Sequence, residues 1–100
     1  MKLPKKINIL GFNYTVTYEE TEQMMRNSWA GMVSNLTKQI HVAPNMPDES
    51  KLDTILHEII HAIDHITSGE NTTTLTERQT QLLSTGLESV LRNNKVQEWL

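Results

Sequence analysis

The chain changes its hydrophobic pattern at Pro44 and Pro47, and this change constrains the fold more than any other feature of the sequence. Before the prolines, apolar residues occur in short runs or alternate with polar ones, which is typical of β-strands. After them, apolar residues recur every three or four positions over long stretches, which is typical of amphipathic helices. This order indicates the α+β class: a short twisted sheet of the antiparallel type packed on two C-terminal helices.

Four short strands are expected in the first half, over residues 7–10, 12–18, 29–33 and 39–42. Gly11 separates the first two and predicts a hairpin turn, because glycine adopts the backbone angles of tight turns without steric cost. A second turn is expected around Ser34 and Asn35, and residues 19–27 suit a short helix. The alternation along the second strand places four side chains on one face of the sheet: Phe12, Tyr14, Val16 and Tyr18.

The first long helix is expected over residues 50–67. Ser50, with Asp53 three positions later, fits a capping box, and Ser68 and Gly69 provide a stop. A helical wheel separates its side chains into two faces. The apolar face comprises Leu52, Ile55, Ile59, Ile63 and Ile66, flanked by Leu56 and Ala62. The opposite face comprises Thr54, His57, Glu58, His61 and His65.

A polar loop at residues 70–73 leads to the second long helix, expected over residues 75–92 and ended by Asn93 and Asn94. Its apolar residues are expected to lie in the core: Leu82, Leu83, Leu87, Val90 and Leu91. Three apolar residues near the C-terminus are expected to dock the tail onto the domain: Val96, Trp99 and Leu100.

The length of 100 residues allows one hydrophobic core, so a single domain is expected, with a β half at about 1–45 and a helical half at about 48–94. The absence of cysteine excludes disulfides, cysteine-type zinc sites and thiol nucleophiles. The net charge of −3 argues against a nucleic-acid binder. No apolar run is long enough for a signal peptide or a membrane span. The expected location is therefore the cytoplasm, without a membrane or nucleic-acid partner.

The segment His57-Glu58-Ile59-Ile60-His61 has the form H-E-x-x-H and lies within the first predicted helix. Its i, i+4 spacing puts two imidazoles one turn apart on one face, close enough to share a metal ion. Neutral imidazole is a good zinc ligand, and a catalytic zinc site has three protein ligands and a water. Glu58 lies about 100° round the helix, where a carboxylate can act as general base. The alternative is a solvated helix whose histidines occur together by chance.

Two residues are candidates for the third ligand. His65 lies ~12 Å along the helix axis from His57 and is rotated by ~80°, too far to share one ion on a continuous helix. It is therefore expected to line the cleft or to be exposed. Glu77, at the start of the second helix, is favoured because a loop lets the two helices pack antiparallel. The alternative is that Glu77 only caps its own helix in a Thr74-x-x-Glu77 box, whereas a Thr76-x-x-Gln79 box frees it to point into the cleft.

Weaker candidates complete the site. Asp64 is placed to fix the tautomer of a ligand histidine by a hydrogen bond, or is an exposed helix residue. Tyr14, Tyr18 and His41 are candidates for stabilising an oxyanion, with packing in the core or on a sheet face as the favoured alternative for each.

Residues 54–64 resemble the active-site helix of small phage and bacterial zinc-metallopeptidase-like proteins, minimal gluzincins related to the ImmA/IrrE-type metallopeptidases. Three other segments carry the same resemblance: residues 31–42, which close on Gln39-Ile40-His41-Val42, the Leu75-x-Glu77 helix start, and residues 86–94. The likeness covers most of the chain from about residue 14 to residue 94. H-E-x-x-H is shared by many peptidase families, so the surrounding pattern carries the specific part.

The resemblance implies a minimal zincin-like metallopeptidase domain in which zinc is bound by His57, His61 and Glu77, with Glu58 as the base. It also implies that an edge strand formed by Gln39, Ile40, His41 and Val42 binds an extended peptide by strand addition. The expected function is a zinc-dependent endopeptidase that acts on an unidentified protein, and the resemblance implies that this peptidase is itself a phage protein. The alternative is an inactive, metal-stabilised binding module that sequesters a host partner. A three-histidine nuclease is disfavoured by the His65 spacing and the acidic charge.

Overall fold

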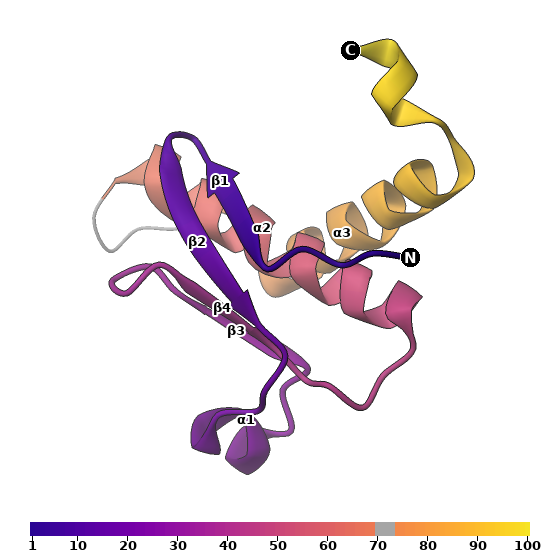
Figure 1. Cartoon of the computed structure of the whole chain (residues 1–100). Helices are drawn as coiled ribbons and strands as arrows, with labels where there is room; N and C mark the ends of the chain where they lie inside the picture. The colour runs from indigo at the N-terminus through magenta and orange to yellow at the C-terminus, as the bar shows by residue number, and fades with distance from the viewer. Residues whose placement is uncertain (70–73) are drawn as a thin grey trace.

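The computed structural model describes residues 1–69 and 74–100, which form a four-stranded sheet and three α-helices followed by a short 3-10 helix (Figure 1). The strands are β1 (Lys6–Ile9), β2 (Phe12–Thr17), β3 (Gly31–Ser34) and β4 (Gln39–Val42). The helices are α1 (Glu22–Asn27), α2 (Asp48–Ser68), α3 (Glu77–Asn93) and the 3-10 helix η1 (Val96–Trp99). The α+β class expected from the sequence is therefore confirmed. The loop expected at residues 70–73 lies outside the described residues.

The strands form one mixed sheet in the order β1-β2-β4-β3. The hairpin between β1 and β2 turns at Leu10 and Gly11, whose φ angles of 51° and 92° are those of a tight two-residue turn. β4 runs antiparallel to β3 but parallel to β2, with Val16 opposite Ile40. This parallel pair departs from the antiparallel sheet expected from the sequence. It arises because α1 and β3 form the crossover connection that two parallel neighbours require.

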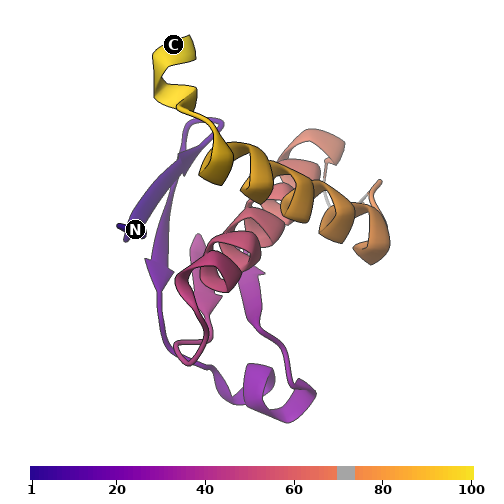
Figure 2. The ribbon, with the colours of Figure 1, turned by 90° about the vertical axis from the view of Figure 1, so that its right-hand side faces the viewer.

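The core lies between one face of the sheet and α2, and α3 packs on the outer side of α2 (Figures 1 and 2). The sheet contributes Tyr14, Val16, Ile40 and Val42, and α2 contributes Ile55 and Ala62. Ala62 is fully buried, although a flanking position was expected, and Ile63 is 39% exposed, although it was expected in the core. The helix is therefore rotated slightly from the predicted orientation, and its contact with the sheet centres on Ile55 and Ala62.

Both ends of α2 are well defined. α2 begins at Asp48 behind Pro47, so the start expected at Ser50 is wrong. Asp48 and Glu49 lie in its first turn, where negative charges interact favourably with the helix dipole and stabilise the helix. α2 ends at Ser68, within one residue of the prediction. Of the helices described, none combines the length and hydropathy that crossing a bilayer requires.

The side of α3 that packs on α2 is polar, contrary to the sequence prediction. Its buried residues are Thr80, Ser84 and Glu88. The hydroxyls of Thr80 and Ser84 donate to carbonyls of their own helix, and Glu88 accepts a hydrogen bond of 2.7 Å from Arg92. These bonds remove most of the cost of burying polar groups. The predicted core residues are instead between 40% and 63% exposed: Leu82, Leu83, Leu87, Val90 and Leu91.

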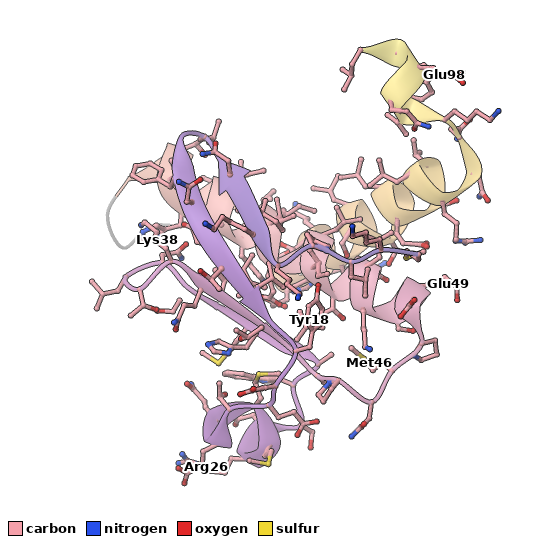
Figure 3. All side chains as sticks on the ribbon, in the orientation of Figure 1. Tyr18, Arg26, Lys38, Met46, Glu49 and Glu98 are labelled. Carbon is pink, nitrogen blue, oxygen red and sulfur yellow. The ribbon has the colours of Figure 1, made fainter. Side chains whose placement is uncertain are left out.

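The last residues of the C-terminal segment do not pack on the domain. Trp99 is 65% exposed and Leu100 is fully exposed, so the docking expected of these two residues is wrong, whereas Val96 is half-buried. η1 stands away from the sheet and α2 in both ribbon views (Figures 1 and 2), and the Glu98 side chain extends into solvent (Figure 3). Apolar character alone therefore did not predict packing for Trp99 and Leu100.

Candidate metal site

Three side chains from α2 and α3 converge at the contact between these helices. The Nε2 atoms of His57 and His61 lie 3.0 Å apart, and the i, i+4 spacing on α2 puts both side chains on one face. Glu77 places Oε2 3.1 Å from Nε2 of His57 and Oε1 2.6 Å from Nε2 of His61. The ligand atoms of these residues all lie within 4.8 Å of one another. The group His57, His61 and Glu77 could therefore hold a metal ion.

Glu77 is free to join this group because another residue caps its helix. Thr76 is the N-cap of α3, and its hydroxyl accepts a hydrogen bond of 3.1 Å from the backbone N–H of Gln79. The Gln79 side chain accepts one of 2.9 Å from the backbone N–H of Thr76. Of the two capping boxes that the sequence allows, the structure therefore contains the Thr76–Gln79 box.

Asp64 fixes the start of α3 against the end of α2. Its carboxylate accepts hydrogen bonds from the backbone N–H groups of Leu75 and Thr74, and from the hydroxyls of Thr74 and Ser68, at 2.8 to 3.1 Å. The bonds from Leu75 and then Thr74 hold the pKa of this carboxyl well below its usual range. The expected hydrogen bond from Asp64 to a ligand histidine is not formed. Asp64 instead holds Thr74 and Leu75, which directly precede the N-cap Thr76 and Glu77.

Glu58 lies beside the three converging side chains, on the side of α2 that faces β3, and only 6% of it is exposed. Burial, and secondly the negative charge of Glu77, raise the pKa of Glu58 to about 8. β3 comes close to α2 at Gly31, where a Cβ atom would lie 3.4 Å from Oε2 of Glu58 and 2.5 Å from Cγ2 of Thr54. Glycine at this position therefore leaves the room that the Glu58 and Thr54 side chains occupy.

The donor atoms suit a divalent metal ion of intermediate softness. Two imidazole nitrogens and one carboxylate oxygen form a ligand set that catalytic zinc sites use, with a fourth position for water or substrate. Bonds of ~2.0–2.2 Å in tetrahedral geometry separate ligand atoms by roughly 3.3 Å. The Nε2–Nε2 separation of 3.0 Å is close to this value, and each Nε2 atom has an oxygen of Glu77 within 3.1 Å. The histidine side chains are 14% and 22% exposed, whereas that of Glu77 is 75% exposed, so the group opens to solvent on one side.

A groove of about 950 Å³ runs past these residues. It is lined by Gly31, Met32 and Val33 of β3, by one side of α2, and by Glu77 and Gln81 of α3. β3 is an edge strand, because its other side pairs with β4. β4 itself is interior, paired with β2 and β3, so the edge-strand role expected for Gln39, Ile40, His41 and Val42 is wrong. The strand available beside the groove is β3.

The other predicted site residues lie apart from the groove, except His65, which is half-buried in its wall. Tyr14 is fully buried in the core, and its hydroxyl donates to Asn35 at 3.0 Å. The Tyr18 hydroxyl donates to the carbonyl of Pro4. His41 shares a hydrogen bond of 2.9 Å with Thr17. Packing, which was the favoured alternative for the two tyrosines and His41, describes their positions.

Sequence reasoning missed Asp53 and Gln81, which line the groove next to the predicted ligands. Oδ2 of Asp53 accepts hydrogen bonds from Thr85 Oγ1 at 3.1 Å and from Gln81 Nε2 at 3.4 Å. The spacing offered a signal, because Asp53 precedes His57 by four residues and Gln81 follows Glu77 by four. Residues four apart lie on the same face of a helix.

Comparison of the chain with family models, with curated proteins and with solved structures gives no match.

Proposed function

We propose that this protein is a zinc-dependent metallopeptidase that cleaves an extended polypeptide segment bound in the groove beside β3. The observation that carries the proposal is the convergence of His57, His61 and Glu77, with the buried carboxyl of Glu58 next to them. Structural zinc sites have four protein ligands, whereas a catalytic site leaves one position open. The three-ligand group on the wall of an open groove fits the second description.

The three metal ligands and Glu58 would have different roles in peptide-bond hydrolysis. A zinc ion held by the three ligands would supply a Lewis acid and lower the pKa of a water in its open position. Glu58 would accept a proton from the attacking water and return it to the departing amine. Its burial strengthens its affinity for a proton, which is the direction that a general base working near neutral pH requires.

β3 supplies a way to hold the substrate. Among the residues that the structure describes, no strand pairs with its outer edge, and an extended peptide can pair with such an edge as an additional strand. Gly31, Met32 and Val33 of this strand line the groove, so a peptide paired with them would run past Glu58. Backbone pairing recognises any extended chain, and the pockets along the groove would then select side chains.

The test compares the zinc-loaded wild type with Glu58→Gln on a library of unstructured peptides, with new peptide ends identified by mass spectrometry. Glu49→Gln is the matched control, because it makes the same change in the exposed first turn of α2 (Figure 3). We expect wild type and Glu49→Gln to cleave, and Glu58→Gln to bind one zinc per chain while cleaving at least ~100-fold more slowly. Equal cleavage by Glu58→Gln would exclude Glu58 as the base.

A zinc-loaded wild type that cleaves nothing would instead favour the alternative of a metal-stabilised binding module. In that case the metal contributes folding free energy only. Any partner captured by the wild type would then also be captured by Glu58→Gln, because that variant keeps the ligands and the groove.

A further inference from the structure

Two buried polar atoms one helical turn apart on α2 have no hydrogen-bond partner: Oδ1 of Asp53 and Nδ1 of His57. Within residues 1–69 and 74–100, these two are the buried side-chain nitrogen and oxygen atoms that lack a hydrogen-bond partner. Buried polar atoms in folded proteins are normally paired, and each exception needs an explanation. Nδ1 of His57 is a possible hydrogen-bond donor, and Oδ1 of Asp53 is an acceptor. The two residues are neighbours on one face of the helix.

The ring of His57 has its two nitrogens in different surroundings. Nε2 faces His61 and Glu77, at 3.0 and 3.1 Å, and is the atom placed to bind a metal ion. A neutral imidazole carries one proton, so a ring that binds through Nε2 carries that proton on Nδ1. In the metal-bound state, Nδ1 of His57 is therefore a buried donor that needs an acceptor.

The carboxylate of Asp53 has such an acceptor to offer. Its Oδ2 is engaged by Thr85 and Gln81 of α3, which leaves Oδ1 free. Residues at i and i+4 of a helix have Cβ atoms ~5–6 Å apart, which a rotation of the Asp53 side chain can bridge. One carboxylate can therefore contact α3 through one oxygen and His57 through the other.

We propose that Asp53 is a positioning residue for the metal site: its Oδ1 accepts a hydrogen bond from Nδ1–H of His57 when the ion is bound. This assignment rests on the proposed metal site. The bond would fix the tautomer and the ring orientation of His57, as carboxylates do for other metal-binding histidines. Through Thr85 and Gln81, the same carboxylate would also hold the helix that supplies Glu77 in register with α2.

The experiment measures zinc affinity by competition with a fluorescent chelator for wild type, Asp53→Asn and Asp53→Ala. Removing an outer carboxylate partner of a metal-binding histidine typically weakens metal binding by ~10–100-fold. We expect a loss of that size in Asp53→Ala and a smaller one in Asp53→Asn, whose amide oxygen is still an acceptor. Asp48→Ala is the matched control, since it removes an exposed carboxylate from the same helix, and its affinity is expected to stay within about threefold of wild type.

A second readout separates positioning of His57 from mere support of α3. Thr85→Val removes one contact between Asp53 and α3 but leaves Oδ1 in place. In nitrogen–proton NMR spectra of the zinc-bound proteins, we expect a slowly exchanging Nδ1 proton on His57 in wild type and Thr85→Val. The same proton should exchange rapidly in Asp53→Ala.

The outcomes are distinct. A wild type that takes up no zinc overturns the proposed function and this assignment with it. A wild type that binds zinc, together with an Asp53→Ala variant of equal affinity and an unchanged Nδ1 proton, overturns the assignment alone. Weakening of Thr85→Val to the level of Asp53→Ala also overturns it, because the effect would then come from the contact with α3.

Discussion

Oε1 of Glu77 lies 2.6 Å from Nε2 of His61, and this contact joins the first residue of α3 to the middle of α2. The residues that α3 buries are polar: Thr80, Ser84 and Glu88. The position of Glu77 therefore depends on specific polar contacts near its own end of the helix: the Thr76 cap and the hydrogen bonds of Asp64 to Thr74 and Leu75.

Glu77→Ala is expected to weaken zinc binding by more than roughly 100-fold, since it removes a ligand and not merely a group that orients one. His61→Ala should have at least the same effect. The measurement is zinc per chain after dialysis, followed by chelator competition on protein without a histidine tag. Glu98→Ala, on the exposed η1, is the control and should bind zinc like wild type (Figure 3). Wild-type affinity in Glu77→Ala would mean that a different residue completes the site.

Gly31→Ala is expected to destabilise the fold by about 1–3 kcal/mol, because the new methyl group would overlap the Thr54 side chain in a tightly packed contact. Gly86→Ala is the matched comparison, since nothing lies within 4 Å of a Cβ at that position in the middle of α3. It should stabilise the protein by ~0.5–1 kcal/mol through helix propensity. Urea unfolding of the metal-free proteins measures both. A neutral Gly31→Ala would show that β3 can move away from α2 without cost.

The contribution of Asp64 to the stability of the fold should depend on pH. The pKa of Asp64 is lowered in the folded protein, so the unfolded chain binds a proton more readily. The free energy of unfolding therefore decreases as the pH is lowered. The contribution is fully present above the unfolded pKa of about 4 and is lost progressively below it. Asp64→Asn should therefore be less stable than wild type at pH 7, and the difference should shrink steadily from pH 4 to pH 2. A constant difference across that range, in urea unfolding of the metal-free proteins, would contradict the assignment.

Leu87→Ala should cost less than about 1 kcal/mol, because 45% of Leu87 is already exposed. Ile55→Ala, at a position only 1% exposed on α2, should cost ~2–5 kcal/mol. The comparison is made by urea unfolding at two protein concentrations. Equal costs for the two variants would mean that the apolar side of α3 is covered in solution.

Features that depend on local sequence could be predicted. The spacing of His57 and His61 fixes their geometry on any continuous helix, and the turn at Gly11, the end of α2 and the two possible caps of α3 follow from nearby residues. The choice between the caps decided whether Glu77 could reach the histidines. Sequence alone left that choice open, because each box satisfies the same helix end.

Features that depend on distant contacts could not be predicted. The parallel pairing of β2 with β4 joins segments separated by α1 and β3, and no short-range pattern specifies it. Periodicity identified which residues of α3 share a face, but not which face meets α2. Thr80, Ser84 and Glu88 pack there because hydrogen bonds within α3 satisfy them, a compensation that hydropathy does not record.

The polar contact between α2 and α3 has a consequence for how the protein responds to its surroundings. A cation shared by His57, His61 and Glu77 would bind only when α3 is docked, so the docked population would rise with the free cation concentration. At one hundred times the dissociation constant, this linkage is worth ~2.7 kcal/mol, a large fraction of the stability of a small domain. Resistance of α3 to proteases would then report metal availability, and starvation for the ion would make the backbone of this helix accessible to degradation.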